Sequence, residues 1–210
     1  MNNSVLNTGR LLGAALRALL VSTVLTGVLY PLSVTGVAQA LFPTEANGSE
    51  VKADGRVVGS APIGQQGYSL DWFQPRPADG LGENSVNTQY RLILSGATNR
   101  SADNPELIKW VKEAKAKVVQ ENSTAGHRVE PSDVPPDAVT SSGSGLDPDI
   151  SPAYAELQVH RVAERNHLSV ARVERLVADH TEGRTLGFLG EPRVNVLALN
   201  IALKELIDGR

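Results

Sequence analysis

The chain has 210 residues, a formal net charge of −3 and no cysteine. The lack of cysteine excludes disulfide frameworks, thiolate zinc sites and thiol nucleophiles. Since Arg10 and Arg17 are the only charged residues among the first forty, a net charge of −3 for the whole chain leaves −5 for the remainder. This mildly acidic remainder has no basic stripe, so we expect no nucleic-acid binding.

An apolar run covers residues 11–42, and residues 18–38 contain no charge. As a helix, a stretch of this length crosses a hydrocarbon core of about 30 Å at a rise of 1.5 Å per residue. We therefore predict three parts: a cytoplasmic N-terminus over residues 1–13, a transmembrane helix over 14–36 and an extracytoplasmic domain over 37–210.

A cleaved secretory signal is the alternative interpretation of the same run, because Ala38-Gln39-Ala40 fits the A-x-A cleavage pattern. The apolar stretch is longer than the about 7–15 residues usual for a signal, and cleavage after Ala40 would release an unusually long leader. These lengths favour a retained anchor.

The charges around the run indicate its orientation. Arg10 and Arg17 precede it, whereas Glu45 and Glu50 follow it. Because basic residues flanking a span stay on the cytoplasmic side, the N-terminus should be cytoplasmic and the bulk of the chain outside.

Within the run, small residues recur at every fourth position: Ala14, Ala18, Ser22 and Thr26. This spacing gives one smooth helix face on which a partner helix can dock. Such residues are also common in membrane helices in general, so the pattern has a second explanation. Pro31 predicts a kink or an end of the helix near Tyr30.

The remainder predicts an α+β (or α/β) domain with helices packed on a small sheet. A β-branched run over residues 56–60 favours a strand. Residues 62–82 are rich in Gly and Pro but contain Tyr68, Trp72 and Phe73, which predicts an ordered loop. Residues 79–100 have the composition of a polar surface segment.

Several helix starts are marked by capping residues. Asn104-Pro105 and Ser151-Pro152 each combine an N-cap residue with proline at the first helical position. Ser169 is the expected cap of a third helix. Pro192 predicts the start of the last helix, over residues 193–207, which should be the most buried element because it is apolar around most of its circumference.

Two catalytic patterns are incomplete. Ser144 lies in Ser142-Gly143-Ser144-Gly145, which lacks the first glycine of a nucleophile elbow, although a membrane-anchored or secreted hydrolase that uses Ser144 and a histidine remains the alternative function. Residues 59–64 space two glycines as in a Walker A loop, but Gln65-Gln66 replaces the Lys-Ser/Thr that holds phosphate and magnesium. The four histidines have no metal-site spacing: His127, His160, His167 and His180.

Several longer strings occur in a characteristic order. They are Thr26-Gly27-x-x-Tyr30-Pro31-Leu32, Phe42-Pro43-x-x-Ala46-Asn47-Gly48-Ser49, Gly59-Ser60-x-x-Ile63-Gly64-Gln65, Ser142-Gly143-Ser144-Gly145-Leu146-Asp147-Pro148-Asp149-Ile150-Ser151-Pro152, Gln158-Val159-x-Arg161-Val162-Ala163 and Gly190-Glu191-Pro192-Arg193-Val194-Asn195-Val196-Leu197-x-Leu199-Asn200-x-Ala202-Leu203. Together they resemble the KdpC subunit family of the bacterial Kdp potassium-transporting P-type ATPase.

This resemblance implies a single-pass, non-catalytic accessory subunit in the cell inner membrane. Its implied partners are the channel-like potassium-binding subunit and the P-type subunit that hydrolyses ATP. The family is described as a catalytic chaperone that raises the ATP affinity of the hydrolysing subunit, with ATP reached through the complex and no cofactor of its own. The resemblance also implies nucleotide contact by Gln158, with Arg161 one turn later. The predicted orientation places both residues on the side of the membrane opposite to cytoplasmic ATP, and we favour the orientation.

Overall fold

The computed structural model describes residues 2–77 and 95–209, with side chains from residue 7 onward. The chain divides into two compact units, Met1–Glu50 and Val51–Arg210. The predicted polar segment over residues 79–100 and the predicted loop over 62–82 therefore lie partly outside the described residues.

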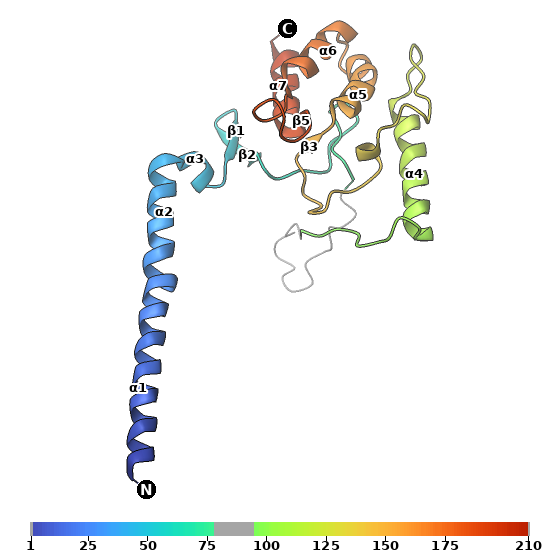
Figure 1. The fold of residues 1–210 in the computed structure, drawn as a ribbon. Coiled ribbons are helices and arrows are strands. Elements are labelled where there is room, and N and C mark those ends of the chain that lie inside the picture. The colour runs from blue at the N-terminus through green and yellow to red at the C-terminus, as the bar shows by residue number, and fades with distance from the viewer. Residues whose placement is uncertain (1, 78–94, 210) are drawn as a thin grey trace. The chain divides into compact units, whose positions relative to one another are not determined.

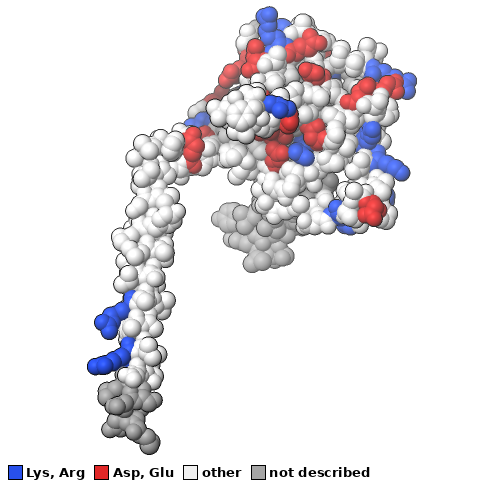
Figure 2. Space-filling view, viewed as in Figure 1, with Lys and Arg blue, Asp and Glu red and all other residues white. Residues whose placement is uncertain are grey.

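The first unit is one long helical run followed by a single short helix (Figure 1). Its elements are α1 (Asn2–Val24), the π-helical turn η1 (Leu25–Leu29), α2 (Tyr30–Leu41) and α3 (Pro43–Ala46). By length and composition Asn7–Leu41 can cross a membrane, and its most apolar part is 0% buried in the structure. Figure 2 shows this run as almost free of charge apart from basic side chains toward its N-terminal end. Its 35 residues reach about 50 Å at 1.5 Å per residue, more than a bilayer core requires, so the boundaries 14–36 stay a prediction.

Pro31 distorts the helix without ending it. The chain widens into η1 immediately before Tyr30 and continues as α2 to Leu41. Proline has no N–H to donate and its ring crowds the carbonyl four residues earlier, and a π turn changes the hydrogen-bonding register at that point. The prediction was a kink or an end near Tyr30: an end is wrong, and the structure shows a π-helical turn immediately before Tyr30.

The second unit is an α+β domain, which confirms the predicted fold class. Its elements in chain order are β1 (Glu50–Ala53), β2 (Arg56–Ser60), α4 (Pro105–Asn122), the 3-10 turn η2 (Pro136–Ala138), β3 (Asp149–Ile150), α5 (Pro152–Arg165), α6 (Val170–Asp179), β4 (Thr181–Glu182), β5 (Arg193–Asn195) and α7 (Val196–Asp208). The strands β1 and β2 form a two-stranded sheet, and β3, β5 and β4 form an antiparallel three-stranded sheet with β5 in the middle.

Helix α5 lies at the centre of this unit, where it contacts α4, α6 and β5 (Figure 1). It buries seven residues, against five for α7, so the expectation that the last helix is the most buried element is wrong. The central position of α5 between α4, α6 and β5 covers more of its surface, and two of its seven buried residues are the polar Gln158 and Arg161. The buried apolar core includes Phe73, Ala155, Val159, Val162, Val173, Val194, Leu199 and Leu203.

The predicted helix starts are mostly confirmed. The Asn104 Oδ1 accepts from the amides of Glu106 at 2.9 Å and Leu107 at 3.2 Å, and the Ser151 Oγ accepts from the amide of Tyr154 at 3.1 Å. The start of the last helix is wrong.

Residues 193–195 form β5, in which Val194 pairs with Ile150 on one side and Thr181 on the other. The helix begins only at Val196, and its cap is the Asn195 Oδ1, which accepts from the amide of Ala198 at 3.0 Å. Because residues 193–195 pair with a strand on each side, the helix starts three residues later than Pro192 predicted.

Candidate functional site

Gln158 and Arg161 lie one turn apart on the buried face of α5. Their exposed fractions are 0% and 2%, and the Arg161 Nη2 donates to the Gln158 Oε1 at 2.7 Å. The structure therefore brings the two candidate residues together. Both side chains bond to the loop segment 70–74, whose backbone crosses this face of the helix.

Gln158 holds this segment with both ends of its amide. Its Oε1 accepts from the amide of Gln74 at 2.6 Å, and its Nε2 donates to the carbonyl of the same residue at 3.1 Å. Asn200 of α7 does the same one residue earlier, since its Oδ1 accepts from the amide of Phe73 at 2.9 Å and its Nδ2 donates to the Phe73 carbonyl at 3.0 Å. A carboxamide offers one acceptor and two donors, which matches a peptide group.

Arg161 holds the start of the segment. Its Nη1 donates to the carbonyl oxygens of Leu70 and, at 3.0 Å, of Trp72. Its Nε donates to the Asn122 Oδ1 of α4 at 2.9 Å. Burial lowers the pKa of Arg161 to about 10, so the guanidinium remains charged at neutral pH. Together Gln158, Arg161 and Asn200 form a polar clamp on residues 70–74.

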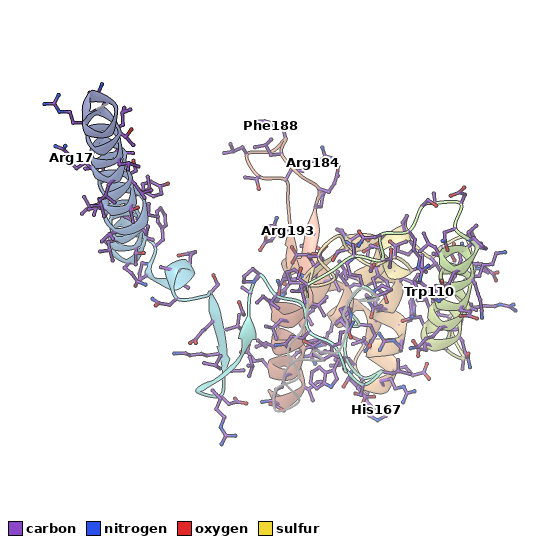
Figure 3. The ribbon with its side chains drawn as sticks, turned by 90° about the horizontal axis from the view of Figure 1, so that it is seen from below. Arg17, Trp110, His167, Arg184, Phe188 and Arg193 are labelled. Atoms are coloured by element: carbon purple, nitrogen blue, oxygen red, sulfur yellow. The ribbon has the colours of Figure 1, made fainter. Side chains whose placement is uncertain are left out.

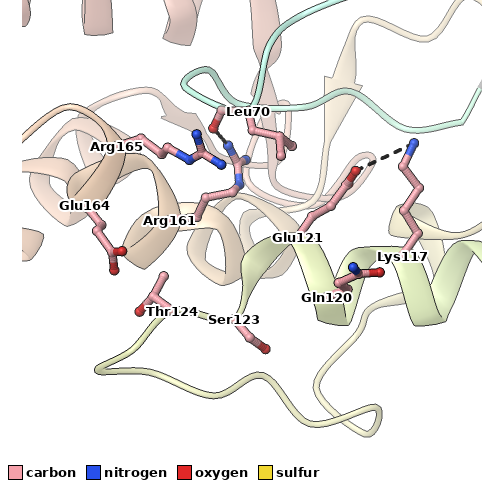
Figure 4. Close-up of a pocket in the computed structure, with 9 residues that line it drawn as sticks. All are labelled: Leu70, Lys117, Gln120, Glu121, Ser123, Thr124, Arg161, Glu164 and Arg165. Atoms are coloured by element: carbon pink, nitrogen blue, oxygen red, sulfur yellow. Dashed lines mark hydrogen bonds and ion pairs between the residues drawn. The ribbon is translucent and has the colours of Figure 1, made fainter.

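A cavity of about 540 Å³ lies beside Arg161, between α4 and α5 (Figure 4). Gln158 is not among its lining residues, which are Leu70, Lys117, Gln120, Glu121, Ser123, Thr124, Arg161, Glu164 and Arg165. Three of these carry positive charge and two carry negative charge, and Lys117 is 3.8 Å from Glu121. A polyphosphate would meet two carboxylates here, so the charge balance suits a polar ligand of small net charge better than a nucleotide.

The small-residue loop over residues 142–149 is attached to the body of the domain. Asp147 forms a 2.8 Å ion pair with Arg76, and the Leu146 carbonyl accepts from the amide of Gly64 at 2.7 Å. A Cβ at Gly64 would lie 2.5 Å from the Asp147 carbonyl oxygen, so this approach requires glycine. The loop thus serves as a packed connection to two distant segments.

Ser144 is exposed, and its hydroxyl has local partners. Its Oγ accepts from the amide of Leu146 at 3.1 Å and lies 3.3 Å from the Ser142 Oγ. In the described residues, which include all four histidines, none of its hydrogen bonds involves an imidazole. A nucleophilic serine requires an adjacent base within hydrogen-bonding distance, so the geometry does not favour the hydrolase alternative.

Two histidines meet at α5, which carries His160. The rings of His127 and His160 are stacked with centroids 3.8 Å apart. Burial lowers the pKa of His160, the charge of His127 acts in the same direction and Glu174 opposes it. Among the described residues no cluster of three or more His, Asp or Glu side chains could hold a metal ion.

The four small residues of the first unit are all exposed: Ala14, Ala18 and Ser22 in α1, and Thr26 in η1. The Thr26 Oγ1 donates to the carbonyl of Ser22 at 2.7 Å, so the hydroxyl is satisfied within the helix. Docking of a partner helix on this face stays a prediction.

Sequence reasoning missed two features of the structure. The first is the role of Asn200, although a single asparagine on the apolar face of the last helix is a recognisable signal. The second is the apolar run 186–189, which forms an exposed hairpin between β4 and β5. Its signal is two leucines and a phenylalanine enclosed by glycines in a polar stretch.

The geometry defines a class of protein: one apolar helix long enough to cross a membrane, followed by a small α+β domain whose buried polar side chains hold its own backbone. Comparison with known proteins narrows this class. Residues 12–205 match the family model described as KdpC: K+-transporting ATPase, c chain.

Three relatives carry the name Potassium-transporting ATPase KdpC subunit. The chain is 72% identical to that of Streptomyces avermitilis over 99% of both chains. It is 66% identical to that of Streptomyces coelicolor over 99% of this chain and 97% of the relative, and 47% identical to that of Mycobacterium tuberculosis over 91% and 96%. The chain therefore belongs to the KdpC family, and the resemblance drawn from its sequence strings is confirmed.

Proposed function

We propose that this chain is a non-catalytic accessory subunit of a potassium-transporting ATPase complex, in which it assembles or stabilises the pump. The observation that carries the proposal is the family match over residues 12–205, which includes both the apolar helix and the α+β domain. The proposed partners are a channel-like potassium-binding subunit and a P-type subunit that hydrolyses ATP. The replacement of the Walker A lysine by Gln65 supports the absence of ATP hydrolysis by the chain itself.

We place the protein in the cell inner membrane, with the N-terminus in the cytoplasm and the α+β domain outside. The positions of Arg10 and Arg17 before the apolar helix support this orientation. Because the chain has no cysteine, a single engineered cysteine is its only thiol. Labelling of that thiol reports on which side of the membrane the substituted position lies.

The topology experiment uses the full chain with its partners in intact spheroplasts. Ala125→Cys, an exposed position near His127, should react with a membrane-impermeant maleimide before lysis. Asn7→Cys is the matched control and should react only after lysis. The reverse pattern of labelling would place the α+β domain in the cytoplasm.

We further propose that the subunit raises the ATP affinity of the hydrolysing subunit through its contacts in the complex, and that Gln158 and Arg161 serve this effect by positioning residues 70–74. The support is that Gln158 is 0% exposed and bonded at both ends of its amide, so a direct nucleotide contact would have to break these bonds. Direct contact would also require the domain to be cytoplasmic.

An experiment on the assembled complex can distinguish positioning of residues 70–74 from direct nucleotide contact as the cause of the raised ATP affinity. With Gln158→Leu we expect the KM for ATP to rise while kcat changes little, and we expect an azido-ATP probe to label the hydrolysing subunit alone. Labelling of this chain that Gln158→Leu abolishes would establish direct nucleotide contact instead.

A further inference from the structure

The hairpin between β4 and β5 projects from the second unit, with Phe188 near its tip (Figure 3). Its strands pair Glu182 with Arg193, and an isolated bridge joins Thr185 to Leu189. Leu186 is 80% exposed and Phe188 is 67% exposed. Among the described residues of this unit, these are the two most exposed large apolar side chains. Contiguous exposed apolar groups in a folded protein mark interaction surfaces.

The hairpin tip has a fixed backbone. The Gly187 amide donates to the Arg184 carbonyl at 3.0 Å, and Thr185 and Leu189 exchange two backbone hydrogen bonds of 2.9 Å. Leu186 has φ 55° and Gly187 has φ 81°. Asparagine and glycine adopt this left-handed conformation far more readily than leucine. Both water and the local backbone thus disfavour leucine at position 186, which is the pattern expected where function selects a residue.

The charged residues of the hairpin that flank its apolar tip form ion pairs with one another and with Asp149 of β3. Arg184 lies 2.6 Å from Glu191, and Arg193 lies 2.8 Å from Glu182 and 3.3 Å from Asp149. Residues 181–195 contain no Lys, Trp or Tyr. Segments that bind a lipid surface rely on unpaired basic residues and on Trp or Tyr at the interface. Paired charges around an apolar centre are instead typical of the rim of a protein interface.

We propose that this apolar hairpin, residues 182–193, docks into an apolar pocket on another subunit of the same complex, with Leu186 and Phe188 as its buried anchors. This inference rests on the proposed function, since it requires the chain to be a subunit of that complex. An aromatic anchor enclosed by polar groups has the anatomy of a binding hot spot. The fixed turn also lowers the entropy lost on binding, because the anchors are already positioned.

The test measures binding of the full-length chain in detergent to a complex that lacks this subunit. Phe188→Ala should weaken binding at least roughly tenfold, the loss typical of a truncated hot-spot aromatic. Leu186→Asn should weaken binding to a similar extent. The unfolding temperature of this variant should be equal to or above that of the wild type, because asparagine suits the left-handed backbone at this position. Ile108→Asn, at a position that is 41% exposed on α4, is the matched control and should bind like the wild type.

A photo-reactive phenylalanine analogue at position 188 identifies the partner in the assembled complex. Adducts with one other subunit support the docking proposal. Adducts with lipid alone, or wild-type binding by both hairpin variants, overturn it. If the unmodified chain itself does not bind the complex, the proposed function fails, and this outcome is distinct from failure of the hairpin alone.

Discussion

Arg161 is a cation with an exposed fraction of 2% that makes four hydrogen bonds to three different parts of the domain: the loop over residues 70–72, α4 and its own helix. If the guanidinium were removed, the Leu70 carbonyl and the Asn122 Oδ1 would lose this donor, whereas the Gln158 Oε1 and the Trp72 carbonyl would each keep a hydrogen bond from Gln74. Leaving a buried polar group without a partner costs more free energy than a hydrogen bond contributes on average, because the group also loses its hydration by water. The clamp therefore couples the position of the loop to the stability of the whole domain.

Arg161→Met should lower the free energy of unfolding by about 3 kcal/mol, because it keeps much of the side-chain volume but removes four hydrogen bonds, including those to the Leu70 carbonyl and the Asn122 Oδ1. Chemical unfolding of the full-length chain in detergent measures this loss. Arg165→Met, one turn later and half exposed, is the control and should change stability by less than about 0.5 kcal/mol. Equal stability of the two variants would show that the clamp is dispensable for folding.

His160 makes the stability of the domain dependent on pH. Burial and the neighbouring His127 lower its pKa in the folded state below the ordinary value of 6.5. The unfolded chain then binds more protons than the folded one between these two values, so stability should fall as the pH drops from about 7 through this window. The unfolding temperature at about pH 5 should be lower than at about pH 7.5.

His160→Phe tests this assignment, since a phenyl ring can still stack on His127 but cannot take a proton. The variant should lose part of the decrease in unfolding temperature on acidification. An unchanged difference between the two pH values would assign the whole effect to other groups, such as carboxylates.

At the scale of elements, α5 and α6 show that the same cap residue does not give the same cap. The Ser151 Oγ accepts from the Tyr154 amide at 3.1 Å and donates to the Asp137 Oδ1 at 2.9 Å. Ser169 stands at the equivalent position of α6, but its side chain makes no capping hydrogen bond. The first serine thus joins its helix to the η2 turn, whereas the second contributes only its backbone conformation.

Ser151→Ala should destabilise the domain by about 1–2 kcal/mol, the upper range for loss of an N-cap, because the hydroxyl bond to the Asp137 Oδ1 is lost with it while the backbone bond to Asp137 remains. Ser169→Ala should lower the free energy of unfolding by only a few tenths of that loss, because no capping hydrogen bond is removed. Thermal unfolding of both variants under one condition makes the comparison. A larger loss for Ser169→Ala would contradict the assignment of the caps.

At the scale of the whole molecule, the two units depend on different surroundings. The second unit buries its own apolar core, so its stability is internal. The most apolar stretch of the first unit is 0% buried and requires a bilayer or partner helices. Association of helices in a membrane depends on close packing of small residues, because lipid chains are as apolar as leucine. The face with Ala14, Ala18, Ser22 and Thr26 is the place where such packing is expected.

The double variant Ala18→Leu/Ser22→Leu should reduce co-purification of the partner subunits through detergent, because two large side chains keep a second helix from approaching. Val24→Leu, which lies on the opposite side of α1 from Ser22, is the matched control and should co-purify normally. Quantified recovery of each partner provides the measurement. Full recovery with the double variant would remove this face from the mechanism of assembly.

Most of the correct predictions came from signals between residues close together in the sequence. The apolar span and the Asn104 and Ser151 caps depend on residues within a turn or two of one another. The family strings extended this to membership of the KdpC family. The same signals predicted the α+β (or α/β) class, because several capped helices follow one short β-branched run.

Only the tertiary structure decided what the polar residues do. Gln158 and Gln74 are 84 positions apart, and Asn200 and Phe73 are 127 positions apart, so no local pattern could pair them. Strands of two or three residues, such as β4 and β5, are too short to show periodicity, which is why the start of α7 and the apolar hairpin were missed. Gln158 and Arg161 are buried because they form hydrogen bonds with backbone groups that are distant in the sequence. Such burial leaves no hydrophobic pattern in the sequence, so only the tertiary structure shows it.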